Sequence, residues 1–430
     1  MSDKSRFISD VKYLGVVQFL NYVVPLFTFP YLTRTLGVSG FGEYSYVIAL
    51  MAYPLMLISF GFDMSATVTI VSLKGCRYRL NEYVTSIYIL KFIFFIIVVI
   101  ILSILIFLNI IPWEQAQNIA ALLPMLFGMV FSSVYIFQAF NLLKHMSLIT
   151  IFFRLLTIPS IYFLVNSELD IIVALYIQSL SAFLIGITSF IYLNISCKSF
   201  LCKTNIRTLK FSFFDSLMIF KTSCASSIYT NSIPLFIGGF YGYELVGVFN
   251  VANTIKNIAQ NFINVFFRVL FPNISRKVHY GSNEEVENVI NKSFLILIGL
   301  IFIGCLSNLF ISGIVIDILS GDEFESANNI LKILMFTVLF SAVNNFYGVQ
   351  TLIPLGMKDD FGKAVIRASI ITMIMIIPTV YFFGAMGGAI ASVLSEVVVF
   401  IFLYMVHRDN NLKIIRYRKL IKIIKDYCDR

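Results

Sequence analysis

Charged residues are scarce in this sequence: Asp, Glu, Lys and Arg make up 13% of its 430 residues, and it has one tryptophan and three histidines. Hydrophobic residues make up 59%, and the mean hydropathy is +0.88. A soluble domain cannot bury so large an apolar fraction, so this composition excludes a soluble globular protein. Since a membrane-spanning helix needs about 20 apolar residues, the chain can cross a bilayer about twelve times with little left for loops. We therefore predict an all-α integral membrane protein.

Cysteine and histidine are too few and too scattered for a disulfide framework or a metal site. Four of the six cysteines fall in segments that we predict to be cytoplasmic, and Cys224 and Cys305 lie within predicted spans. No histidine or second cysteine pair accompanies Cys197 and Cys202 to complete a zinc site. The sequence shows no combination of a nucleophile, a general base and a residue that orients the base, which a catalytic site would need. We expect no metal, no cofactor and no enzymatic chemistry.

Apolar runs between charge clusters predict about six spans in each half of the chain. The first set lies near residues 12–33, 44–66, 84–110, 117–140, 148–166 and 170–194. The second set lies near residues 213–239, 244–271, 293–317, 328–353, 363–383 and 386–406. We therefore predict an N-terminal lobe over 1–200, a linker over 201–212, a C-terminal lobe over 213–406 and a basic tail over 407–430.

The loops between these spans alternate in charge. One side carries most of the cations, namely Lys4, Arg6, Lys12, Lys74, Arg77, Arg79, Lys198, Lys203, Arg207, Lys210, Arg276, Lys277, Lys358 and Lys363. The other side carries most of the acids, namely Glu114, Glu168, Asp170, Glu244, Asp317, Asp322, Glu323 and Glu325. Because cytoplasmic loops are rich in Lys and Arg, both termini are predicted to be cytoplasmic.

The tail after Tyr404 holds eight Lys or Arg and three Asp, so it supplies 8 − 3 = +5 of the formal net charge of +9. Since the excess charge is local, it does not indicate a nucleic-acid partner. Apolar residues from Leu412 to Tyr427 fall near one helical face, as in an interfacial helix on anionic membrane lipids. A charge cluster that only fixes the topology is an equal alternative.

Several segments in order resemble a known family. They are Pro30 to Gly37 with Gly40 to Gly42, Gly61 to Thr67, Gly247 to Ala252, Phe271 to Arg276, Gly321 to Phe324, and Gly384 to Ala391. The chain resembles the O-antigen (Wzx-type) flippases, polysaccharide-export members of the multidrug/oligosaccharidyl-lipid/polysaccharide superfamily. Asp63 departs from the asparagine that is more common in this family.

The resemblance implies two six-helix lobes around a central cavity. It also implies a transported substrate, an undecaprenyl-diphosphate-linked oligosaccharide that moves from the cytoplasmic to the periplasmic leaflet of the bacterial inner membrane. A polysaccharide polymerase and a chain-length regulator are candidate partners. Such a flippase needs a hydrophilic, preferably cationic, cavity for the diphosphate and the glycan, so some helices should carry polar faces.

The predicted span near 244–271 carries such a face. Its asparagines recur at helical spacing, and further polar residues widen the stripe; the set is Asn250, Asn253, Asn257, Asn261, Asn264, Gln260, Lys256 and Arg268. A stripe of this kind cannot face lipid, because unsatisfied polar groups there cost several kcal/mol. We predict that it lines the translocation cavity. The alternative is a hydrogen-bonded seam between helices.

Lys256 lies about halfway along that span, where an ionisable residue indicates function. We predict that it binds the substrate diphosphate; the alternative is a salt bridge with Glu396, in the last span. Lys91, Arg154 and Lys221 are second-rank candidates because they lie near cytoplasmic helix ends, where snorkelling explains such residues.

Asp63 and Arg268 are separated by 268 − 63 = 205 residues, the same offset as Gly42 and Gly247, which marks a faint internal repeat. This offset suggests a cytoplasmic gate in which Asp63 pairs with Arg268. Two unrelated interfacial charges are the alternative.

Two other functions fit a chain of this kind. A drug/cation antiporter of the same superfamily would share the lobes, but the spans of the first half carry few acids for coupling cations. A membrane glycan polymerase or ligase generally needs a large periplasmic loop for its chemistry, and the exterior loops here are short. The sequence therefore favours the flippase.

Overall fold

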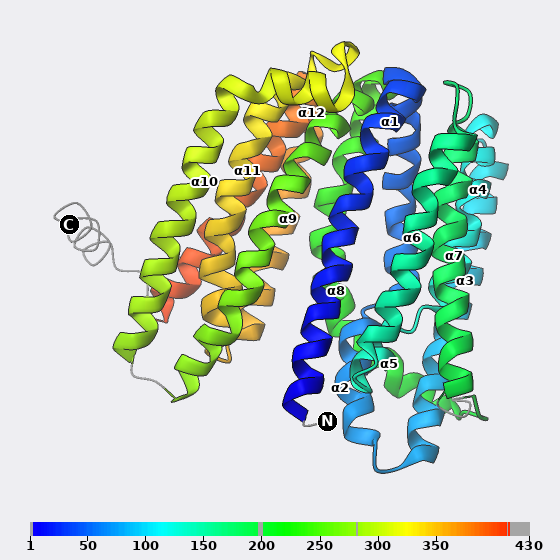
Figure 1. The fold of residues 1–430 in the computed structure, drawn as a ribbon, viewed down its shortest axis with the longest axis vertical. Coiled ribbons are helices and arrows are strands. Elements are labelled where there is room, and N and C mark those ends of the chain that lie inside the picture. The colour runs from blue at the N-terminus through cyan, green and yellow to red at the C-terminus, as the bar shows by residue number, and fades with distance from the viewer. Residues whose placement is uncertain (1–2, 197–200, 281–282, 411, 413–430) are drawn as a thin grey trace. The chain divides into compact units, whose positions relative to one another are not determined.

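A computed structural model describes residues 3–196, 201–280, 283–410 and 412. Within these residues every regular element is a helix, as the composition predicts (Figure 1). Contacts divide the chain into two compact units, Met1–Ser227 and Ile228–Arg430, with the division inside one long helix. The predicted linker, 201–212, overlaps the first residues of that helix, and the predicted start of the C-terminal lobe at residue 213 lies inside it, ahead of the observed division. Residues 413–430, with the predicted interfacial helix of the tail, lie outside the described residues.

The helices follow the predicted spans closely. The first part of the chain forms α1 (Asp3–Ser59), α2 (Phe62–Leu73), α3 (Arg77–Phe107), α4 (Trp113–Phe131), α5 (Val134–Ala139), α6 (Leu143–Leu164), α7 (Ile171–Ser196) and α8 (Ile206–Tyr241). The second part forms α9 (Tyr243–Tyr280), α10 (Asn283–Ser320), the short 3-10 helix η1 (Asp322–Phe324), α11 (Ala327–Tyr347), the π-helix η2 (Gly348–Leu352) and α12 (Lys358–Asp409).

Two of these helices are each a pair of spans joined at a glycine. Gly37 in α1 has φ 64°, and Gly384 in α12 has φ 56°, a region that glycine adopts without the steric cost of a side chain. Each glycine breaks the helical path, so α1 and α12 contain two spans apiece. With this division the described residues hold six spanning segments up to α7 and six from α8 onward, in agreement with the prediction.

Most of these segments are apolar enough to be recognised by hydropathy alone. Among the described residues, eight segments have the length and composition of membrane spans, and α8 and α9 do not reach that threshold. The exposed side chains of α10, such as Ile303, Phe310 and Ile314, are large and apolar, as expected for a surface that faces lipid. The lower hydropathy of α9 reflects the polar stripe that it carries.

In the second unit, α11 packs against α9, α10 and α12 (Figure 1). Buried side chains from three of these helices form one core, including Phe267 of α9, Ile301 of α10 and Phe346 of α11. The rings of Phe267 and Phe346 meet edge to face, with centroids 5.2 Å apart. This packing fixes the rotation of α9 about its own axis, and hence the direction in which its polar residues point.

Candidate substrate-translocation site

The polar stripe of α9 lies on an unbroken helix, because α9 continues from Tyr243 to Tyr280. Its apolar face is buried: Val251 and Ala252 are fully buried, while Asn253 is half-buried and Asn257 is exposed. The amide nitrogen of Asn250 is buried and has no hydrogen-bond partner among the described residues. Most of the stripe therefore remains outside the core of its unit, as a face that lines a polar cavity would.

Further along the stripe, Gln260 donates a hydrogen bond from Nε2 to Oδ1 of Asn264, at 3.3 Å. Asn261 and Asn264 are half-buried, and Arg268 is exposed. A seam between helices would show hydrogen bonds from these amides to another helix. The bond between Gln260 and Asn264 stays within α9, as expected for a stripe that lines a cavity, and the role of the stripe stays a prediction.

Lys256 and Glu396 belong to the same unit, on α9 and α12. Glu396 acts electrostatically on Lys256, but no salt bridge joins Lys256 to any residue in the described ranges. Glu396 is instead bound by Asn344, whose Nδ2 donates to Oε2 of Glu396 at 2.6 Å and to its carbonyl oxygen at 2.8 Å. The direct salt bridge that was the alternative for Lys256 is thus not formed there. The ammonium keeps its hydrogen-bonding capacity for another anion.

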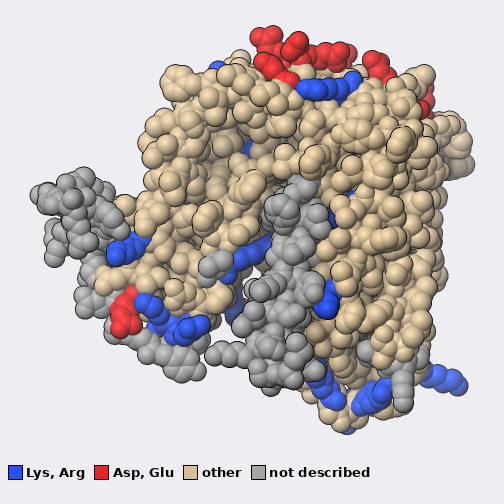
Figure 2. All heavy atoms as spheres, in the orientation of Figure 1, with Lys and Arg blue, Asp and Glu red and all other residues tan. Residues whose placement is uncertain are grey.

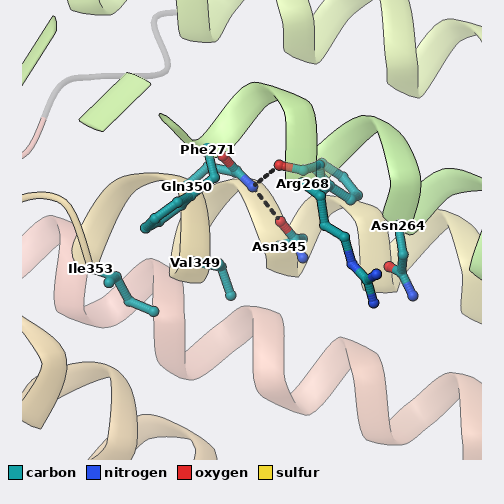
Figure 3. Close-up of a pocket in the computed structure, with 8 residues that line it drawn as sticks. Asn264, Arg268, Phe271, Asn345, Val349, Gln350 and Ile353 are labelled. Atoms are coloured by element: carbon teal, nitrogen blue, oxygen red, sulfur yellow. Dashed lines mark hydrogen bonds between the residues drawn. The ribbon is translucent and has the colours of Figure 1, made fainter. Parts of the chain in front are cut away.

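A pocket of about 360 Å³ opens beside Arg268, between α9 and the end of α11 (Figure 3). Its polar and aromatic lining comprises Asn264, Phe267, Arg268, Phe271, Asn345 and Gln350. Figure 3 shows the guanidinium of Arg268 and the amide of Asn264 on the same side of the pocket. Within the described part of the chain, that guanidinium has no hydrogen-bond or salt-bridge partner.

Gln350 lies in the π-helix η2 and is 1% exposed. Its Nε2 donates to the carbonyl oxygen of Phe267 at 3.2 Å and to Oδ1 of Asn345 at 3.1 Å (Figure 3). Its Oε1 is buried and has no partner among the described residues. The wider turn is held by Thr351, whose hydroxyl donates to the carbonyl oxygen of Phe346 at 2.7 Å. Single π-turns in α-helices often occur at functional sites.

A second polar cluster lies in the first unit, around Lys91 of α3. This side chain is 0% exposed; its Nζ donates to the carbonyl oxygen of Ser132 at 2.8 Å and lies 5.1 Å from the centre of the Tyr135 ring. Asp63, at the start of α2, acts on it electrostatically. Snorkelling toward water was the wrong explanation for Lys91, because its ammonium points into the protein.

The other second-rank cations differ from Lys91. Arg154 of α6 is half-buried, and Lys221 of α8 is exposed. Neither side chain forms a salt bridge or hydrogen bond within the described ranges, and both residues stay predictions as substrate contacts. The gate proposed between Asp63 and Arg268 also stays a prediction.

The structure adds polar residues that the sequence analysis missed. Asn344, Asn345 and Gln350 interrupt the apolar run of α11 and η2, which was the available sign of their importance. Asp215 of α8 belongs to the first unit, where its Oδ2 accepts hydrogen bonds from Tyr83 at 2.9 Å and Thr69 at 3.1 Å.

In the described residues, no group of three or more His, Cys, Asp or Glu could hold a metal ion.

Comparison with known proteins gives consistent results. The family model described as "Polysaccharide biosynthesis protein" matches residues 7–278. A protein of Escherichia coli (strain K12) named "Putative O-antigen transporter" is 30% identical to this chain, over 94% of this chain and 97% of that protein.

Two solved structures share the fold. The lipid II flippase MurJ, in an inward closed conformation, superposes with a TM-score of 0.74 at 13% identity, over 94% of this chain and 90% of that one. An inward-facing multidrug resistance transporter of the MATE family superposes with a TM-score of 0.68 at 15% identity, over 92% of this chain and 97% of that one. At these identities both likenesses concern the fold alone.

Proposed function

This chain belongs to the polysaccharide biosynthesis protein family, and on that premise we propose that it is a flippase for lipid-linked oligosaccharides. Its substrate is an oligosaccharide joined to undecaprenyl diphosphate, of the O-antigen or a similar type. The protein moves this substrate from the cytoplasmic to the periplasmic leaflet by alternating access. A polymerase and a chain-length regulator then act on the exported unit, and membrane lipids surround the helices.

The observation that carries this proposal is the polar face of α9 together with Lys256. A cation within a span costs about 2.5 to 3.5 kcal/mol on insertion scales, so it requires a compensating role. An acid that held Lys256 in a salt bridge would supply that role, but Glu396 is bound by Asn344 instead. The ammonium is therefore suited to receive the diphosphate as a compact, strongly hydrated point charge.

The two other functions are less well supported. The fold is shared with a MATE multidrug transporter, so the fold alone does not separate a flippase from a drug/cation antiporter. The matching family and the O-antigen transporter relative favour the flippase. A relative named as a transporter also favours transport over a polymerase or ligase activity.

Replacing Lys256 tests the proposed function. Lys256→Ala should lower surface polysaccharide at least about tenfold, equivalent to about 1.4 kcal/mol, and the lipid-linked unit should accumulate inside the cell. Lys256→Arg should retain part of the activity, because the charge survives while its geometry changes. Surface polysaccharide is measured by immunoblotting, and the lipid-linked unit by extraction and mass spectrometry. Lys292→Ala is the matched control, since Lys292 is exposed on α10.

Thiol labelling tests whether the stripe meets water. Cysteines at Asn253, Asn257 and Asn261 should react with membrane-impermeant maleimides in a background without native cysteines. A cysteine at Val251 should not react, since Val251 is fully buried. An inert stripe together with a fully active Lys256→Ala protein at normal abundance would show that the stripe is a packing seam between helices and not the translocation pathway.

A further inference from the structure

The pocket beside Arg268 lies too far from Lys256 for both cations to hold one diphosphate. The two residues are 268 − 256 = 12 positions apart on one continuous helix. At 1.5 Å per residue, this separation is about 18 Å along the axis. Two linked phosphates span only a few ångströms, whereas several linked sugars reach that far. The pocket therefore needs a ligand other than the diphosphate bound at Lys256.

We propose that this pocket is a subsite for one acidic sugar of the transported glycan. This inference rests on the proposed flippase function. With the cytoplasmic termini predicted from the loop charges, Arg268 lies on the cytoplasmic side of Lys256. Before transport, the glycan lies on the cytoplasmic side of its diphosphate. The pocket thus lies where the sugars of a substrate held at Lys256 would be.

The lining supplies the contacts that a sugar ring needs. The side-chain amides of Asn264, Asn345 and Gln350 offer donors and acceptors for ring hydroxyls. The rings of Phe267 and Phe271 offer apolar surface for the C–H face of a sugar. A volume of about 360 Å³ falls within the range of small-molecule pockets.

Arg268 indicates that the sugar carries a carboxylate. Its guanidinium has no hydrogen-bond or salt-bridge partner in the described ranges, and a guanidinium pairs with a carboxylate through two parallel hydrogen bonds. Because Arg268 is exposed, its guanidinium can reach a carboxylate on a sugar in the pocket. A uronic acid or a related acidic sugar supplies that carboxylate.

The buried oxygen of Gln350 is a second, independent observation. Leaving a buried acceptor unsatisfied costs about 1 to 3 kcal/mol. The π-helix holds this side chain at the pocket, with its nitrogen already committed to the carbonyl oxygen of Phe267 and to Asn345. A hydroxyl of the bound sugar can donate to the free Oε1. Gly348 starts the π-helix, and a Cβ there would lie 2.5 Å from the Phe361 ring, so a side chain at this position would have to displace that ring.

A protection experiment on the purified full chain tests the subsite. The variant Asn345→Cys, in a background without native cysteines, is labelled with a maleimide while glucuronate, glucose or pyrophosphate is present at millimolar concentration. We expect glucuronate to slow labelling several-fold and glucose to have a much smaller effect. Arg268→Gln should abolish the protection, and Val349→Phe, which fills the pocket without changing its charge, should also abolish it.

The outcomes separate the subsite from the proposed function. Equal protection by pyrophosphate and glucuronate would make the pocket a general oxyanion site and overturn the sugar subsite, as would no protection by any probe. In cells, Arg268→Gln should lower export several-fold and Arg268→Lys should retain part of it. If Lys256→Ala abolishes export while Arg268→Gln exports normally, the proposed flippase function is supported and the proposed sugar subsite is refuted. If Lys256→Ala also exports normally, the diphosphate site at Lys256 fails; if cells that lack the protein export normally, the proposed function itself fails.

Discussion

Lys91 and Lys256 are both cations within spans, but their surroundings differ. Lys91 is 0% exposed and satisfied by the carbonyl oxygen of Ser132, the ring of Tyr135 and the field of Asp63. Lys256 is half-buried and has no salt-bridge partner in the described ranges. Glu396 acts electrostatically on Lys256 as Asp63 does on Lys91, but only the ammonium of Lys91 donates a hydrogen bond within the described ranges, to Ser132, so the ammonium of Lys256 is available to a ligand. The two lysines should therefore respond differently to substitution.

We predict that Lys91→Met destabilises the folded protein. Lys91 is fully buried and Asp63 acts on it electrostatically, so the variant leaves the Asp63 carboxylate without that cation; breaking a buried ion pair costs about 3 to 5 kcal/mol, and the loss here should be smaller because Asp63 is half-buried and forms no salt bridge in the described ranges. The melting temperature in detergent should fall by several degrees. The double variant Lys91→Met, Asp63→Asn should recover part of the loss, because it removes both charges. Lys74→Ala is the control, since Lys74 is exposed between α2 and α3.

Thermal unfolding of the single and double variants measures this coupling directly. Lys256→Ala should leave the melting temperature nearly unchanged while export is lost. A Lys91→Met protein as stable as the parent would show that the buried ammonium contributes nothing to the fold. A double variant less stable than both single variants would show that Asp63 is not its partner.

At the scale of elements, α4 and α7 approach so closely that only glycine fits at the crossing. A Cβ on Gly128 would lie 2.5 Å from the Cα of Phe183, and a Cβ on Gly186 would overlap the backbone of Gly128. Small residues allow this close approach of helix backbones in membranes. Since the obstructing atoms belong to the backbone, they cannot move aside cheaply.

We predict that Gly186→Ala lowers the melting temperature or prevents accumulation of the folded protein. Overpacking of this kind costs about 1 to 3 kcal/mol, and more where backbone atoms obstruct. Gly304→Ala is the matched control, because Gly304 lies in α10 with no atom within 4 Å of the added Cβ. That control should be as stable as the parent. Equal melting temperatures for both variants would contradict the close crossing.

At the scale of the whole chain, the distribution of charge sets the expected orientation. In the first unit, Lys74, Arg77 and Arg79 are exposed around the α2–α3 connection, where Figure 2 shows a group of cations. In the second unit, Asp317, Asp322, Glu323 and Glu325 are exposed around the α10–α11 connection, where Figure 2 shows a group of acids. The rule that cytoplasmic loops are positive places the α2–α3 connection inside and the α10–α11 connection outside.

Cysteine labelling in intact cells tests this orientation. A cysteine at Glu325 should react with a membrane-impermeant maleimide added outside. Cysteines at Lys74 and Lys358, also exposed, should react only after the cells are permeabilised. The parent must first be freed of its native cysteines, since Cys76 is exposed. Labelling of Lys74→Cys in intact cells would show that the true topology is the inverse of the predicted one.

The sequence by itself determined the all-helical membrane class, the positions of the spans and the polar stripe of α9. Each of these properties is local: hydropathy over about 20 residues defines a span, and helical periodicity defines a face. Glycine was harder to interpret, because a glycine is equally compatible with a packed helix and with a break. The structure shows that Gly37 and Gly384 each separate two spans within one helix, and a separate break at Gly61 places Asp63 in the first turn of α2.

Tertiary structure alone decided which polar residues meet. Lys256 and Glu396 are 140 residues apart in the sequence (396 − 256). In the structure Glu396 accepts a hydrogen bond from Asn344 and forms no salt bridge with Lys256. The pocket at Arg268 needs α9 and the π-helix together, and nothing in the sequence marks a π-turn at Gly348. Burial likewise depends on every neighbouring helix at once, so Lys91 could not be distinguished in the sequence from a lysine that reaches toward water.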